Sequence, residues 1–337
     1  MPTTIHDIKA EGFERLVEVR NDDVGLYGCI AVHNTKLGPA LGGIRYKEYY
    51  DGTAAIQDVC DLARAMTNKN ALANINYGGG KAVILKNSAK VDRKDIYRAM
   101  GEAVELLGGT YICCEDVGTV TADLYNVLET TKYCAGTQSD SGIATAAGLF
   151  YVFREYCEWI EAEYADVTVT ISGLGKVGSR LGEKLSATGF PLKVTDINVE
   201  AVETFWKHHL RTHRAYPSTA HQEACEVYSP CALGGIINRS TRRELNCNAI
   251  IGSANNQLDM NETARYLHRR GILYFPDYLV NAGGVVALAA ELDGQMDNLD
   301  YYLEMIGDRA GIILRDAQYE ERSLLDIANE MVWETLE

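Results

Sequence analysis

The sequence has few basic residues for the number of acidic ones. Its 337 residues include 32 Lys and Arg against 47 Asp and Glu, which gives a formal net charge of −15. A surface with this balance repels nucleic-acid phosphates and anionic membranes, and no basic stripe interrupts it. We therefore expect no nucleic-acid partner and no association with a membrane.

Long apolar runs are also missing from the sequence. The longest, such as Ala282 to Ala290, fall far short of the ~20 residues that a membrane-spanning helix needs. The stretch from Met1 to Asp7 has no basic region followed by an apolar one, so it does not predict a signal peptide. These two features lead us to expect a cytoplasmic protein.

Paired cysteine motifs and metal-binding clusters are not evident either. The nine cysteines are an odd number and none forms a C-x-x-C pair, which favours a reduced chain with buried thiols. His209 and His213 are four residues apart, but they lie in a basic stretch without a cysteine or carboxylate nearby. That context favours a solvated helix end over a metal site, so we predict no metal.

The sequence does contain enough apolar residues for two domains, since 47% of its residues are hydrophobic. The most turn-rich run of its first half, residues 136–142, predicts the boundary between them. We expect one domain over residues 1–138, a second over residues 139–305, and C-terminal helices over residues 306–337 that pack back toward the first domain.

Two lysines stand in unusual positions within the first domain. Lys69 extends the apolar face of a predicted helix, and Lys81 follows three glycines, which predict a tight turn, and opens an apolar strand over residues 82–85. A lysine kept partly from water has a lowered pKa and becomes useful for acid–base chemistry. The alternative for each lysine alone is ordinary: its long side chain reaches water from a helix end or a loop.

A carboxylate completes this set. Asp116 comes directly after a short predicted strand, Tyr111 to Cys114, where open α/β sheets place groups that bind ligands. Alone it could equally be a turn or cap residue. Together with the two lysines it favours a site for proton transfer.

The second domain begins with a dinucleotide-binding pattern. A β-branched strand over residues 167–172 leads into Gly173, Leu174, Gly175, Lys176, Val177 and Gly178, and a helix follows. The glycines permit the turn, the approach of a pyrophosphate and close helix packing, while the helix N-terminus faces the anion. Asp196, 23 positions after Gly173, ends the next strand and is predicted to accept hydrogen bonds from a ribose.

The residues after Asp196 indicate which dinucleotide binds. Ile197 and Asn198 follow it, and neither supplies the positive charge that a 2′-phosphate would need, so we predict NAD rather than NADP. Three later strand-to-loop junctions end in small or amide residues where cofactor and substrate are expected; ordinary turn chemistry is the alternative. The positions assigned there to the cofactor are Cys231, Ala232, Ala254, Asn255 and Asn281.

Nine motifs in order resemble one family over nearly the whole chain: the amino acid dehydrogenases acting on leucine, valine and phenylalanine, relatives of glutamate dehydrogenase. The matching blocks begin at Gly38, Met66, Gly78, Glu115, Gly173, Thr195, Ser229, Ala254 and Asn281. The resemblance implies an α/β substrate-binding and oligomerisation domain followed by a Rossmann-type, doubly wound NAD domain, with the active site in the cleft between them. It also implies a homo-oligomer.

The resemblance further implies a reaction and roles. The reaction is the reversible oxidative deamination of an L-amino acid to a 2-oxo acid and ammonia, with a hydride passed to NAD. Lys69, with backbone groups around Gly42, would hold the substrate carboxylate, Lys81 would polarise the carbonyl or activate water, and Asp116 would move protons to and from the amine. Asn255 and Thr145 would contact the nicotinamide; the segment before Thr145 departs from the family pattern because it lacks the usual prolines.

The resemblance also places the pocket for the substrate side chain. Glutamate dehydrogenases carry a lysine where this chain has Leu41, so a glutamate side chain would be left here as an unpaired buried anion. The other pocket positions are Cys114, Val285 and Leu288, all apolar. We predict a small branched aliphatic substrate: leucine, valine or isoleucine. The alternatives are an aromatic or specialised substrate, such as phenylalanine or tryptophan, and a non-catalytic sensor of NAD or amino acids.

Overall fold

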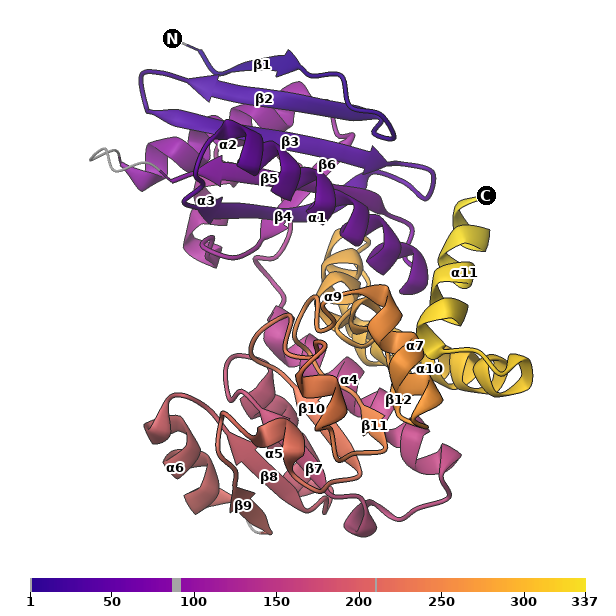
Figure 1. Ribbon diagram of the computed structural model, residues 1–337. Helices are drawn as coiled ribbons and strands as arrows, with labels where there is room; N and C mark the ends of the chain where they lie inside the picture. The colour runs from indigo at the N-terminus through magenta and orange to yellow at the C-terminus, as the bar shows by residue number, and fades with distance from the viewer. Residues whose placement is uncertain (1, 87–91, 210) are drawn as a thin grey trace. The chain divides into compact units, whose positions relative to one another are not determined.

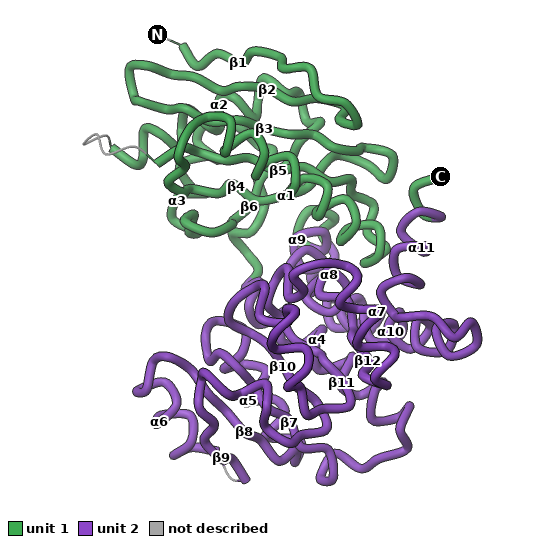
Figure 2. The backbone as a smooth tube through the Cα atoms, in the orientation of Figure 1, with its two compact units in different colours: residues 1–139, 291–294, 335–337 green, residues 140–290, 295–334 purple. Residues whose placement is uncertain are grey.

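The structure is a computed structural model that describes residues 2–86, 92–209 and 211–337. It contains two compact units (Figure 2). Unit 1 comprises residues 1–139, 291–294 and 335–337, and unit 2 comprises residues 140–290 and 295–334. Most of the C-terminal segment that the sequence assigns to a separate set of helices therefore belongs to unit 2.

Unit 1 is built on a mixed six-stranded sheet in the order β1-β2-β3-β5-β4-β6 (Figure 1). The first four strands in this order pair antiparallel, whereas β4 lies parallel to both β5 and β6. The strands are β1 (Thr4–Asp7), β2 (Arg15–Asn21), β3 (Leu26–Asn34), β4 (Ala40–Lys47), β5 (Gly78–Leu85) and β6 (Tyr111–Glu115).

Helices cover both faces of this sheet. The apolar side of α1 (Gly52–Leu72), which includes Val59 and Ala63, packs on Ala31 and Val83 from one face. The opposite face packs on α2 (Arg93–Leu106) and α3 (Thr121–Leu128). Asp51 caps α1 by accepting a hydrogen bond from Ala54 N at 2.8 Å. The helix that the apolar periodicity predicts before Lys69 is therefore confirmed.

The three glycines before Lys81 do not form the turn that the sequence predicts. They are the first residues of β5, paired with β3 on one side and, at Gly78 and Gly79, with β4 on the other. The reason for glycine is close packing: a Cβ on Gly79 would lie 2.1 Å from the backbone N of Thr67 in α1, and one on Gly78 would lie 2.0 Å from Asn34 O. The glycines thus let a helix and neighbouring strands approach the start of β5.

Unit 2 contains a fully parallel sheet in the order β12-β11-β10-β7-β8-β9. The chain runs outward from β7 to one edge and then returns to β10 on its other side, which is the doubly wound topology. The predicted fold class is confirmed. The strands are β7 (Val169–Ser172), β8 (Leu192–Thr195), β9 (Thr212–Arg214), β10 (Val227–Pro230), β11 (Ala249–Ile250) and β12 (Leu273–Tyr274).

The helices after residue 139 include a long one near the start of unit 2 and another near its end. Of these, α4 packs against α10, near the end of the chain. The helices are α4 (Ser141–Trp159), α5 (Gly178–Ala187), α6 (Val199–His208), α7 (Asn261–Arg269), α8 (Asp277–Val280), α9 (Gly283–Leu292), α10 (Leu299–Glu320) and α11 (Leu324–Leu336).

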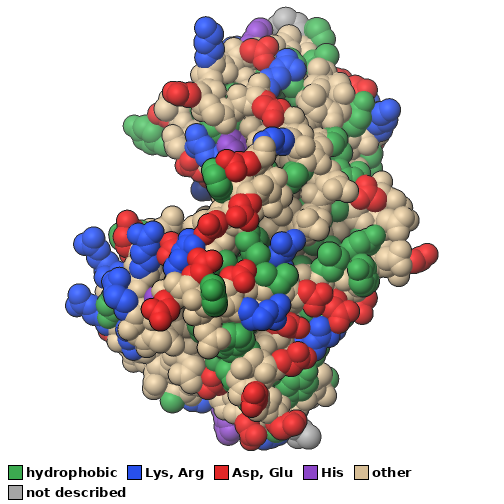
Figure 3. Space-filling view, turned by 90° about the vertical axis from the view of Figure 1, so that its right-hand side faces the viewer, with side chains coloured by type: hydrophobic (Ala, Val, Ile, Leu, Met, Phe, Trp, Pro, Cys, Tyr) green, Lys and Arg blue, Asp and Glu red, His purple; other side chains and the backbone are tan. Residues whose placement is uncertain are grey.

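Several features that the composition suggests can be located. The nine cysteines are unpaired, and all but Cys225 and Cys231 are buried. His209 ends α6 and stacks on Phe205, whereas His213 lies in β9, so the two histidines do not share a helix face. Acidic and basic side chains are interspersed over the face shown in Figure 3. Within the described ranges, no helix is long and apolar enough to cross a membrane.

Gly79→Ala tests the packing of α1 on β5. The added Cβ would meet backbone as well as side-chain atoms of Thr67, so the helix must shift. We expect the free energy of unfolding to fall by at least about 2 kcal/mol, measured by urea denaturation. Gly52→Ala is the matched control, because a Cβ there has no heavy atom within 4 Å. Equal stability of the two variants would contradict this packing.

Candidate active site

Lys81 is a buried cation in the middle of β5. The residue is 5% exposed, and its Nζ lies 3.0 Å from Oδ1 of Asp116. The β4–β5 register passes from Leu41–Gly79 to Ile44–Ala82, so Lys81 stands where this ladder is interrupted beside Gly42 and Gly43. An unpaired buried charge destabilises a fold strongly, and the Asp116 carboxylate supplies the partner that Lys81 needs.

Asp116 is held in place by the loop that follows β6. Thr119 donates its hydroxyl to Ile44 O at 2.6 Å and shares a hydrogen bond with the Tyr97 hydroxyl at 2.7 Å. The backbone N–H of Tyr46 bonds to Val117 O, and that of Thr119 bonds back to Asp116 O, both at 2.9 Å. The turn is therefore fixed to β4, and the carboxylate has little freedom to leave Lys81.

The charges around Asp116 keep it ionised. Burial opposes ionisation, but the positive charges of Lys81 and Arg45, and the hydrogen bonds from both, outweigh it. The pKa of Asp116 consequently lies below its ordinary value of 3.8. The neighbouring thiol is neutral, because burial raises the pKa of Cys114 to about 12.

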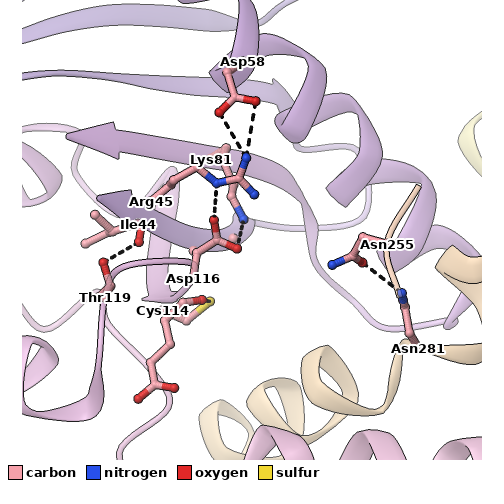
Figure 4. Close-up of polar contacts among 12 residues, drawn as sticks. Ile44, Arg45, Asp58, Lys81, Cys114, Asp116, Thr119, Asn255 and Asn281 are labelled. Atoms are coloured by element: carbon pink, nitrogen blue, oxygen red, sulfur yellow. Dashed lines mark hydrogen bonds and ion pairs between the residues drawn. The ribbon is translucent and has the colours of Figure 1, made fainter. Parts of the chain in front are cut away.

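Arg45 is a member of the site that the sequence analysis missed. Its Nε donates to Asp116 Oδ2 at 2.7 Å, so the two oxygens of this carboxylate face two different cations (Figure 4). Its side chain is 17% exposed. The signal in the sequence was a charged residue that directly follows the uncharged run Ala40 to Ile44.

The residues expected to bind the substrate carboxylate lie near the start of β4 and the end of α1. Lys69 is half-buried in the last turn of α1. Its neighbour Asn70 donates to Gly78 O at 2.7 Å and to Leu41 O at 3.4 Å, which ties this helix end to both strands. Gly42 is buried, and its carbonyl accepts a hydrogen bond from the Tyr111 hydroxyl at 2.6 Å.

In unit 2, the three glycines of the dinucleotide pattern differ in their surroundings. Gly173 has a φ of 111° and lies against Ala232, the residue after Cys231 beyond β10. A Cβ on Gly178 would lie 2.0 Å from Gly173 O, so this glycine brings α5 close to β7. Gly175 has no heavy atom within 4 Å of its Cβ position, which leaves its backbone approachable. Leu174, Lys176 and Val177 complete the loop between them.

Asp196 lies at the end of β8 and holds this loop. Its carboxylate accepts hydrogen bonds from Leu174 N at 2.7 Å and from Asn198 N at 2.8 Å. A carboxylate has about four acceptor positions, so further donors can still bind to it. Ile197, beside it, is 91% exposed.

The remaining predicted positions of unit 2 lie on three segments. Asn281 donates to Asn255 Oδ1 at 2.9 Å and to Ser253 O at 3.2 Å, next to Ala254, and its own Oδ1 is buried without a partner among the described residues. Thr145 in α4 donates to Ser141 O at 2.6 Å. Val285 and Leu288 are buried residues of α9.

Comparison with known proteins identifies the family of the chain. A profile described as Glu/Leu/Phe/Val dehydrogenase, dimerisation domain, matches residues 13–133, and one described as Glutamate/Leucine/Phenylalanine/Valine dehydrogenase matches residues 191–317. The chain belongs to this family. It is an amino acid dehydrogenase, an oxidoreductase, and the Rossmann-type unit of such an enzyme serves a nicotinamide cofactor.

Individual relatives of this dehydrogenase carry different substrate names. Phenylalanine dehydrogenase of Bacillus thermotolerans is 38% identical over 85% of this chain and 78% of its own length. Valine dehydrogenase of Streptomyces albus is also 38% identical, over 84% of this chain and 80% of its own. The crystal structure of L-tryptophan dehydrogenase from Nostoc punctiforme superposes with a TM-score of 0.85 at 31% identity, covering 96% of each chain.

Asp116→Asn tests the ionic role of this residue in the dehydrogenase. The folded-state pKa of Asp116 is lowered, so its ionisation contributes stability that is present above pH 3.8 and lost as the pH falls through the lower folded value. We expect the variant to lose about 3 kcal/mol of unfolding free energy at pH 7, and the deficit to shrink below about pH 4.

The measurement is urea unfolding of both proteins from pH 7 to pH 3. Asp61→Asn is the matched control: its partner is Arg64 at 3.3 Å, its side chain is 59% exposed, and such exposed pairs contribute little. A deficit for Asp116→Asn that stays constant across this pH range would show that the carboxylate is not stabilised by its charge.

Proposed function

We propose that this dehydrogenase catalyses the NAD-dependent, reversible oxidative deamination of a small branched-chain aliphatic L-amino acid to its 2-oxo acid and ammonia. The observation that carries the proposal is the buried ion pair of Lys81 and Asp116, whose charged atoms are 3.0 Å apart. A structural ion pair gives no net advantage over apolar packing on average. A reaction that moves protons at an amine and a carbonyl does require both groups.

The predicted site residues of unit 1 each have a role in the proposed reaction. Lys69 and backbone groups near Gly42 bind the substrate carboxylate, which leaves Cα and its nitrogen to face the ion pair. Asp116 accepts a proton from the substrate ammonium and later returns it to the departing ammonia. Lys81 polarises the 2-oxo carbonyl in one direction and activates water in the other. The NAD that unit 2 would hold supplies the hydride acceptor for this chemistry.

Unit 2 has features that fit NAD. The open backbone at Gly175 and the N-terminus of α5 suit a pyrophosphate, in agreement with the glycine pattern. Asp196 would accept hydrogen bonds from ribose hydroxyls but would repel a 2′-phosphate. The residue after it, Ile197, is apolar and offers no positive charge to such a phosphate. The buried Oδ1 of Asn281 accepts no hydrogen bond from the described residues. The carboxamide N–H of a nicotinamide would supply a donor for it.

The identity of the substrate side chain is inferred from four positions that the family resemblance assigns to its pocket. All four are apolar: Leu41, Cys114, Val285 and Leu288. Leu41 is fully buried and offers no countercharge to a carboxylate side chain. One methylene changes discrimination by only ~1 to 3 kcal/mol, so leucine, valine and isoleucine should overlap as substrates. An aromatic substrate is the second candidate, because the phenylalanine-named relative is as similar as the valine-named one and a tryptophan dehydrogenase shares the fold closely.

We also propose a homo-oligomer. The profile that matches residues 13–133 is described as a dimerisation domain. Light scattering of the purified chain would give the number of subunits.

The decisive assay follows reductive amination with ammonia and a panel of 2-oxo acids. We expect oxidation of NADH with the keto acids of leucine, valine and isoleucine, slower oxidation with phenylpyruvate, and none with 2-oxoglutarate. NADPH should be a poor donor because of Asp196. Faster turnover with an aromatic 2-oxo acid would replace the aliphatic assignment, and absence of turnover with every acid would favour a non-catalytic binding protein.

Lys81→Ala separates the chemistry from cofactor binding. We expect its turnover to fall at least about 10²-fold, because a positioned acid–base group contributes 10²- to 10⁴-fold, while NADH still binds by fluorescence titration. Lys86→Ala is the matched control from the residue after β5; this lysine is half exposed and pairs with Glu48 at 3.4 Å. Equal activity of the two variants would mean that Lys81 has been misassigned.

A further inference from the structure

Arg45 bridges two carboxylates that come from different parts of unit 1. Besides its bond to Asp116, its Nη1 donates to Asp58 Oδ2 at 3.0 Å and to Asp58 Oδ1 at 3.3 Å (Figure 4). Asp58 belongs to α1, Arg45 to β4, and Asp116 to the loop after β6. One side chain therefore connects the helix, the sheet and the loop that carries the proposed proton acceptor.

The far end of this bridge is itself held. Tyr49 donates its hydroxyl to Asp58 Oδ2 at 2.6 Å, and burial together with this hydrogen bond raises the pKa of Tyr49, so the tyrosine remains a donor. The side chains of Arg45 and Asp58 are 17% and 28% exposed, which limits screening by solvent. A guanidinium is planar and always charged, so it fixes direction as well as charge.

This arrangement divides the Asp116 carboxylate between two cations of different kinds. Oδ2 faces Arg45, whose proton does not move, and Oδ1 faces Lys81, an amine that can transfer protons. With Asp58 included, the cluster contains two positive and two negative side chains. If Lys81 gives up its proton, Asp116 still has a positive partner.

We propose that Arg45 is a positioning residue for the reaction: it holds Asp116 by Oδ2, directs Oδ1 toward Lys81, and supplies the fixed charge that keeps Asp116 a proton acceptor. This inference rests on the proposed function and adds to it a residue that does not touch the substrate. If the role of Arg45 were purely structural, its link between β4 and α1 would be sufficient, and its charge beside Asp116 would not affect the reaction.

Other groups around Asp116 do not supply this charge. Cys114 and Tyr111 in β6 are buried, and burial raises the pKa of both, so they are neutral near pH 7. Asp58 in α1 and Glu115 in β6 are acidic and would oppose ionisation of Asp116. Among the described residues around Asp116, Lys81 in β5 and Arg45 in β4 favour its ionisation.

The test is the pH dependence of kcat/KM for deamination in the full-length enzyme. Arg45→Gln removes the positive charge, so the Lys81–Asp116 pair should bind protons more readily. We expect its acid limb to move to higher pH by about one unit, which is a tenfold loss of kcat/KM at a pH on that limb. Arg45→Lys keeps the charge and should restore the limb to within about 0.3 unit, with kcat still reduced because the fork to Asp58 is lost.

Asp58→Asn supplies a change of opposite sign and serves if Arg45→Gln folds poorly. Removing this negative charge leaves Arg45 entirely to Asp116, so the acid limb should move to lower pH. Arg20→Gln controls for net charge, because Arg20 lies in β2, pairs with Asp22 at 2.8 Å and is 51% exposed. Thermal unfolding of each variant reports its fold.

The outcomes separate this inference from the proposed function. A wild-type enzyme that turns over no 2-oxo acid or amino acid overturns the function itself. An active wild type with an acid limb unchanged in both Arg45→Gln and Asp58→Asn overturns the role of Arg45 alone. Equal losses in Arg45→Gln and Arg45→Lys, without movement of the limb, would likewise assign Arg45 to structure only.

Discussion

The ion pair between Lys81 and Asp116 is the interaction around which the candidate site of unit 1 is organised. A lysine that is 5% exposed in the middle of a strand would be unstable alone, and its carboxylate partner comes from a different strand end. The loop after β6 is fixed to β4 by hydrogen bonds at Thr119 and Tyr46, so the Asp116 carboxylate is held beside Lys81. Arg45 then uses the second oxygen of the same carboxylate.

Glycines make both units possible, for different physical reasons. In β5 they have no side chains because α1 and the adjacent strands come too close for a Cβ. In the loop after β7, Gly173 adopts a left-handed conformation and Gly178 permits helix packing, while Gly175 stays open. Close contact thus explains most of these glycines, and only the open one has a surface that a ligand can use.

Much of the fold could be predicted from the sequence because its signals are local. The helix before Lys69 shows its period directly, and the glycine pattern lies between a strand and a helix. The turn at Gly78 to Gly80 was predicted wrongly because a triglycine looks the same in a turn and in a crowded strand. Arg45 was missed because its partners lie 13 and 71 residues away, and only the folded sheet brings them together.

The choice of substrate is harder to predict, since apolar pockets that differ by one methylene differ little in energy. The pairing of Lys81 with Asp116 is a sharper claim, and a double-mutant cycle measures it most directly. Lys81→Ala, Asp116→Asn and the double variant would be compared by kcat/KM for reductive amination. If the two residues act as one unit, the double variant should be no more than about threefold slower than the slower single variant. Losses that multiply would show that the two residues act independently and would contradict the account.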